Sequence, residues 1–114
     1  MADTYSKLAQ TDLTALSTPI VLVTAGATEQ IIVKHIRVVN QSTSNSTAIK
    51  MWQTGTTDDD LILPAADIAD GGWAEFEGTI ILDPTEVLYA SKENSTGATT
   101  ADITITVYGL EMTP

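Results

Sequence analysis

The chain has no cysteine, one histidine, one phenylalanine and only five Lys and Arg residues among its 114. Without cysteine, neither a disulfide nor a thiolate metal site supports the fold. The longest unbroken apolar runs span about four residues, far short of the ~20 that form a membrane-spanning helix. The opening residues, MADTYSKLAQTD, lack the basic and apolar regions of a secretory signal. We therefore expect a single domain that is synthesised in the cytoplasm.

Basic residues are scarce, whereas acidic residues are not. Fifteen Asp and Glu against five Lys and Arg give a net charge of −10. Such a surface repels nucleic-acid phosphates and anionic lipid, so we expect no nucleic acid and no membrane among the partners. The acidity suits solubility at high concentration, or alternatively a basic patch on a protein partner.

What is abundant is β-forming sequence. The chain has 19 threonines, and seven of the nine residues from 31 to 39 are β-branched or carry an aromatic ring. Both features favour strands over helices. Ala25-Gly26 supplies a turn before this segment. Ile36 and Val38 are expected to face the core, which leaves Lys34, His35 and Arg37 for contact with a partner.

Short apolar segments separated by turn residues run from Pro19 to Leu110. The expected strands are 19–24, 29–40, 48–53, 61–63, 73–76, 79–82, 87–91 and 103–110. Pro64 is expected to end the fourth of them, and 65–70 to form at most a helical turn. About seven or eight short strands predict an all-β fold with a single antiparallel β-sandwich, either jelly-roll-like or Ig-like. Residues 18–114 would form the sandwich and residues 1–17 a polar N-terminal arm.

Catalytic and metal sites are hard to find in this sequence. His35 has no other histidine or cysteine to share a metal, and a strand-surface histidine is the simpler interpretation. Asp58-Asp59-Asp60 lacks the alternate spacing of calcium loops. Glu75 and Glu77 share one strand face, as paired catalytic carboxylates do, but exposed pairs are common in acidic proteins. We therefore expect no catalytic residues, no metal, no cofactor and no enzymatic activity.

Exposed aromatic and apolar residues are the better candidates for function. The residues predicted to form an interface are Tyr5, Leu8, Leu13, His35, Arg37, Trp52 and Trp73. Trp52 and Trp73 lie in alternating strands, so packing in a core or interface is the default. A carbohydrate platform is the alternative, because aromatic rings stack on sugars. The polar loops 41–47 and 93–100 are further candidates for partner binding.

Several short motifs occur in a particular order along most of the chain. They are a Leu-Ala-Gln start at Leu8, TAGAT at Thr24–Thr28, IRVVN at Ile36–Asn40, Leu63-Pro64, GTIILDPTEVLYAS at Gly78–Ser91 and YGLE at Tyr108–Glu111. This order resembles a loose group of small structural proteins of tailed-bacteriophage virions. Two departures affect turns: Val23-Thr24 stands where the group has Val-Pro, and Asp83–Glu86 stands where it has Ala-Gly-Asp.

The resemblance implies a virion structural protein without catalytic residues. We expect a capsid decoration or cement protein that binds the outer face of the major capsid protein shell, as a trimer or another symmetric homo-oligomer. Its location would be the capsid surface, after synthesis in the host cytoplasm. A tail or baseplate component is one alternative, and a module that binds host-surface carbohydrate is another.

Overall fold

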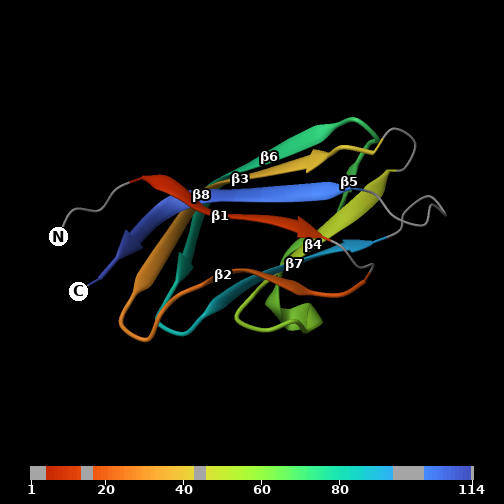
Figure 1. The fold of residues 1–114 in the computed structure, drawn as a ribbon. Helices are drawn as coiled ribbons and strands as arrows, with labels where there is room; N and C mark the ends of the chain where they lie inside the picture. Colours follow the sequence, from red (N-terminus) through yellow and green to blue (C-terminus); the bar gives the residue numbers. More distant parts are fainter. Residues whose placement is uncertain (1–4, 14–16, 43–45, 94–101, 114) are drawn as a thin grey trace.

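Two four-stranded antiparallel sheets pack face to face (Figure 1). The computed structural model describes residues 5–13, 17–42, 46–93 and 102–113, with side chains omitted at 64–66. The strands are β1 (Ser6–Leu13), β2 (Ile20–Thr24), β3 (Gln30–Asn40), β4 (Thr47–Gln53), β5 (Leu61–Ile68), β6 (Trp73–Leu82), β7 (Val87–Glu93) and β8 (Ile103–Met112). A 3-10 helix, η1 (Asp58–Asp60), precedes β5. No helix in the part of the chain that the structure describes is long and apolar enough to cross a membrane.

The strand orders are β1-β8-β3-β6 and β2-β7-β4-β5. Antiparallel pairing joins β4 to β5, β3 to β6, β2 to β7 and β1 to β8, so the chain is one long double strand folded over itself. Successive pairs alternate between the two sheets. This is the jelly-roll arrangement of eight strands in two Greek keys. The predicted β-sandwich is confirmed, and of its two expected forms the Ig-like one is wrong.

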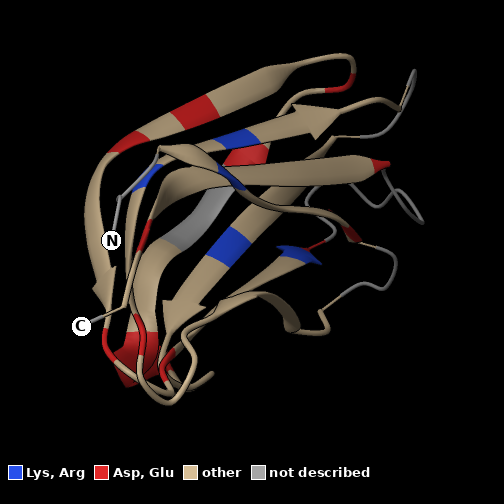
Figure 2. Cartoon of the chain, turned by 60° about the vertical axis from the view of Figure 1, so that its left-hand side comes forward, with Lys and Arg blue, Asp and Glu red and all other residues tan. Residues whose placement is uncertain are grey.

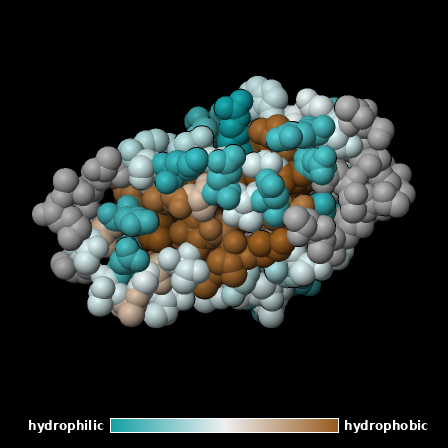
Figure 3. Space-filling model, viewed as in Figure 1, coloured by the Kyte–Doolittle hydropathy of each residue, from teal (hydrophilic) through white to brown (hydrophobic). Residues whose placement is uncertain are grey.

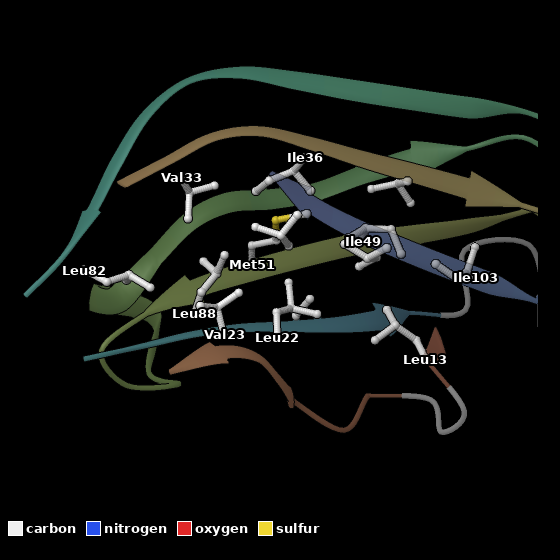
Figure 4. Packing of buried hydrophobic residues seen from close by; sticks show 14 of the residues in the cluster. Leu13, Leu22, Val23, Val33, Ile36, Ile49, Met51, Leu82, Leu88 and Ile103 are labelled. Carbon is white, nitrogen blue, oxygen red and sulfur yellow. The ribbon is translucent and has the colours of Figure 1, made fainter. Parts of the chain in front are cut away.

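The core lies between the inner faces of the sheets (Figure 4). Ile36 and Val38 of β3 belong to it, as predicted, together with Ile49 and Met51 of β4. Along β8, Ile103, Ile105 and Val107 alternate inward with the period of two that a strand imposes. Because these side chains are buried together, the sheets are held mainly by apolar contact.

A line of irregularities crosses the β1-β8-β3-β6 sheet. The register shifts between Lys7 and Ala9 in β1, and between Val33 and His35 in β3. The β3 shift inserts one residue, so its inward positions change from odd (31, 33) to even (36, 38, 40). Extra residues add local twist, and the strands of this sheet bend in the same region (Figure 1).

Two positions where a strand was expected to end lie inside longer strands. Pro64 lies inside β5, because β5 is an edge strand and the register shifts beside it, between Ile49 and Met51 of β4. An edge strand at a bulge needs no N–H at that position. The expected helical turn at 65–70 is therefore wrong over 65–68. Likewise β6 continues through Glu77-Gly78, where the pairing with β3 is irregular and Gly78 has φ 157°.

The expected N-terminal arm is wrong over the residues of β1. Residues 6–13 pair with β8 along the edge of the sheet, and Leu13 is 2% exposed within the core. The segment looked polar because only one side of an edge strand faces the core. The sandwich therefore includes β1, and the boundary expected at residue 17 does not separate it from the rest.

Two amide side chains join the sheets at opposite ends. Asn40, at the end of β3, donates through Nδ2 to the carbonyl oxygen of Ile68 in β5, at 3.3 Å. Gln53, at the end of β4, donates through Nε2 to the carbonyl oxygen of Ile81 in β6, at 2.6 Å. Both bonds satisfy backbone acceptors where the ladders end, so they help to fix how one sheet lies on the other.

Candidate functional site: the outer face of the β1-β8-β3-β6 sheet

The sheet's side away from the core carries most of the predicted contact residues. Cross-strand pairing places three rows of side chains there: Lys7, Tyr108, His35 and Glu77; Gln10, Thr106, Arg37 and Glu75; and Asp12, Thr104, Val39 and Trp73. We call this surface, with Tyr5 and Lys34 at its border, the outer sheet face. Each row spans four strands that are far apart in sequence.

Three rings stack across the first row. The Tyr108 ring lies 5.4 Å from the His35 ring at an interplanar angle of 20°. The Tyr5 ring lies 6.4 Å from Tyr108 on its other side, at 8°. Tyr5 is 54% exposed, so the outermost ring of the stack offers much of its surface to solvent. Stacked rings restrain one another, which makes this a comparatively rigid apolar surface.

Arg37 links the other aromatic residue of this face to a carboxylate. Its guanidinium carbon lies 5.4 Å from the centre of the Trp73 ring, in a cation–π contact. Its Nε lies 3.9 Å from Oε1 of Glu75. Trp73 is still 60% exposed, a high value for the largest side chain in the protein. A large exposed ring held by a neighbour is the kind of residue that anchors interfaces.

The charges on the outer sheet face balance, although the whole chain is strongly acidic. Lys7, Lys34 and Arg37 are three of the five basic residues, and they lie among Asp12, Glu75 and Glu77. Lys34 donates to Thr79 Oγ1 at 3.0 Å. Figure 2 shows blue segments of β3 beside red segments of β6. A face with no net charge approaches a partner, or a second copy, with little repulsion.

His35, Glu75 and Glu77 come together on this face. Their potential ligand atoms all lie within 4.8 Å of one another. In the sequence, His35 and the two glutamates lie about 40 positions apart, and no second His or Cys accompanies the histidine. Only the pairing of β3 with β6 reveals the neighbours, since His35 lies directly opposite Glu77. The alternate spacing of Glu75 and Glu77 was the one feature of the sequence that pointed to this cluster.

The remaining predicted interface residues lie elsewhere. Leu8, at the β1 bulge, is half-buried and packs against the core. Leu13 belongs to the core itself, and Trp52 is only 7% exposed. The expectations that Leu13 and Trp52 contact a partner are therefore wrong, because their own chain covers them. Of the loops predicted at 41–47 and 93–100, residues 43–45 and 94–100 lie outside the described residues.

In the acidic turn before β5, the Asp60 carboxylate bonds within its own turn. Thr57 donates to Asp60 Oδ2 from both its backbone N–H, at 3.3 Å, and its hydroxyl, at 2.8 Å. At the neighbouring turn Glu86 accepts from the Thr54 hydroxyl at 2.6 Å and from the Asp83 N–H at 2.8 Å. These bonds, that from Thr54 foremost, lower the pKa of the Glu86 carboxyl.

A second surface shows apolar side chains along the edges formed by β1 and β2. Figure 3 shows hydrophobic residues across the middle of this face, bordered by hydrophilic ones. Val21 of β2 is 48% exposed, while Ile20 is half-buried and packs against the core. Unlike the outer sheet face, this band carries no described ring stack.

Comparisons with known proteins bear on the fold. No family model and no curated protein matches the chain. Among solved structures, one from Bacillus endospore appendages, described as a family of disulfide-linked pili, is similar with TM-score 0.53 and 13% identity, over 99% of this chain and 91% of that one. The Drosophila NLP core, described in terms of pentamer formation and histone binding, follows with TM-score 0.46 and 12% identity, over 96% and 98%. A structure of infectious bursal disease virus, Gx strain, has TM-score 0.43 and 13% identity, over 96% of this chain and 30% of that one. The first likeness supports the fold alone, and the other two carry no argument.

Proposed function

We propose that this protein is a structural component of a tailed-bacteriophage virion, a capsid decoration or cement protein that binds the outer face of the major capsid protein shell. The observation that carries the proposal is the outer sheet face. It combines two rings that are more than half exposed, Tyr5 and Trp73, with balanced charge in an otherwise acidic molecule. Large exposed rings on a rigid sheet suit a protein interface.

Binding to the assembled shell would stabilise it by mass action. A ligand that binds only the assembled state raises the free energy needed to disassemble it. The acidic remainder of the surface would keep neighbouring copies soluble before assembly. The similar pilus subunits are described as disulfide-linked. This chain has no cysteine, so no disulfide can link copies of it.

The test measures binding to shells assembled from the major capsid protein of the same virus. Wild type should saturate the shells, and Trp73→Ala should lose at least tenfold in affinity, because the most exposed described ring of this face is removed. Val21→Ala is the matched control, since it removes an exposed apolar side chain from the other sheet. Equal binding by Trp73→Ala and wild type would refute the assignment of this face.

Copy number distinguishes a shell protein from a tail or baseplate component. A decoration protein should be present at a level comparable to the major capsid protein, whereas a tail or baseplate part should be far scarcer. Quantitative mass spectrometry of purified particles measures the ratio. Light scattering of the isolated protein tests the proposed trimer or other symmetric homo-oligomer.

A carbohydrate-binding module is the second candidate, favoured by the exposed Trp73 ring. A flat indole beside a guanidinium could stack on a sugar ring, as aromatic platforms do. A glycan array should then give a signal that Trp73→Ala abolishes. Absence of signal for the wild-type protein would remove this candidate without affecting the virion proposal.

A further inference from the structure

Three potential metal ligands from two strands converge on the outer sheet face. His35 comes from β3, and Glu77 lies directly opposite it on β6. Glu75 is two residues before Glu77, so its side chain leaves the same side of the sheet. The candidate ligand atoms all lie within 4.8 Å of one another. One ion placed among them is therefore within reach of all three after small rotations of side chains.

The histidine nitrogen in this cluster is buried and makes no hydrogen bond. Nε2 of His35 is shielded from solvent and has no hydrogen-bond partner among the described residues. It lies 3.3 Å from Oε2 of Glu75, within the range of an ion pair but without the geometry of a hydrogen bond. A shielded nitrogen that makes no hydrogen bond is uncommon in folded proteins and calls for an explanation.

We propose that His35, Glu75 and Glu77 bind a divalent transition-metal ion of the zinc class. A cation between Nε2 and the two carboxylates would satisfy the nitrogen and offset the repulsion between the glutamates. Imidazole and carboxylate together suit zinc and its first-row neighbours, whereas calcium and magnesium prefer oxygen ligands alone. Three protein ligands leave at least one coordination position for water or for a group from a partner.

The surroundings of the cluster restrain two of the three ligands. The Tyr108 ring stacks on His35 at 5.4 Å and limits the ring's rotation. Arg37 lies 3.9 Å from Oε1 of Glu75, so Oε2 is the oxygen turned toward His35. These neighbours orient the two ligands before an ion arrives, as the groups around known metal sites do. They also distinguish the cluster from a set of freely rotating surface carboxylates.

The experiment titrates the whole chain with zinc chloride by calorimetry and with cobalt chloride by visible absorption. We expect one saturable site, with a cobalt spectrum characteristic of mixed nitrogen and oxygen ligands. Glu77→Gln should weaken binding at least tenfold while leaving the fold intact, because it is a conservative change at an exposed position. His35→Gln should weaken binding as much and change the cobalt absorption.

Glu111→Gln is the matched control, because it removes an exposed carboxylate from β8 of the same sheet. It should bind as wild type does. Equal affinity in Glu77→Gln and wild type, or no saturation by either metal at millimolar concentration, would reduce the cluster to a histidine–carboxylate ion pair and overturn the proposal. A parallel titration with calcium chloride tests the metal class, and saturation by calcium alone would overturn it.

Discussion

Gly109→Ala tests the tightest surroundings of any described glycine. Gly109 is buried in β8, which lies between β1 and β3, and it pairs with Ser6 on one side and Val33 on the other. A Cβ at this position would lie 2.1 Å from the carbonyl oxygen of Ile32 and 3.0 Å from its carbonyl carbon. Non-bonded heavy atoms pack best at about 3.5 Å or more, so β3 and β8 would have to separate by more than 1 Å.

The separation is costly because both neighbours of β8 hold it by ladder hydrogen bonds. Overpacking of this kind costs about 1–3 kcal/mol, and a clash with backbone on a central strand belongs at the upper end. We expect the free energy of unfolding to fall by about 3 kcal/mol, which lowers Tm by about 12 °C at roughly 4 °C per kcal/mol. Calorimetry and urea unfolding measure both quantities.

Gly26→Ala is the control for this prediction. Its Cβ would also meet an atom at short range, 2.6 Å, but that atom is the carboxylate oxygen of Glu29 at the end of a flexible side chain. The side chain can turn away, so we expect a loss below about 1 kcal/mol. The test compares the Tm of Gly109→Ala with that of wild type. If the two differ by less than about 2 °C, at roughly 4 °C per kcal/mol, the inferred crowding between β3 and β8 is wrong.

Three further predictions concern stability. Leu88→Ala should cost about 2–5 kcal/mol in urea unfolding, because this fully buried side chain leaves a cavity; a loss below about 1 kcal/mol would contradict the packing. Because the pKa of Glu86 is lowered in the folded protein, wild type should have a higher free energy of unfolding than Glu86→Gln near neutral pH. This difference in stability should disappear as the pH falls through the lowered pKa. A stability difference that is constant with pH would contradict the role of the Glu86 hydrogen bonds. Deleting residues 1–13 should lower Tm markedly in calorimetry, because it removes β1 and Leu13 from the core; an unchanged Tm would mean that β1 is dispensable.

Sequence patterns were most informative where a strand is long and buried on one side. Residues 29–40 were expected as a strand with Ile36 and Val38 inward; the structure has a strand at Gln30–Asn40 and both side chains in the core. The alternating apolar residues of this segment define a strand by themselves, so the prediction did not depend on knowing its neighbouring strands. The bulge at Lys34 was not foreseen, because an inserted residue depends on the register of β6 and β8.

Edge strands were the least predictable part of the fold. β1 has the composition of a loop, since a strand at the border of a sheet keeps much of its surface in solvent. β5 contains Pro64, which marks a strand's end in most sequence contexts but is tolerated at an edge. In both segments the missing information was the position of the strand in its sheet.

By itself, the sequence determined that this is an all-β sandwich of about eight short strands, because β-branched residues, period-two alternation and turn residues act over a few neighbouring positions. It also singled out His35, Arg37 and Trp73 as residues for contact, since their types stand out from their strands. Only the tertiary structure decided between jelly-roll and Ig-like pairing, placed Leu13 and Trp52 out of reach, and brought His35 against Glu75 and Glu77. Those outcomes depend on which strands lie side by side. His35 is 40 positions from Glu75 in the sequence, and local sequence carries little information about pairing over such a distance.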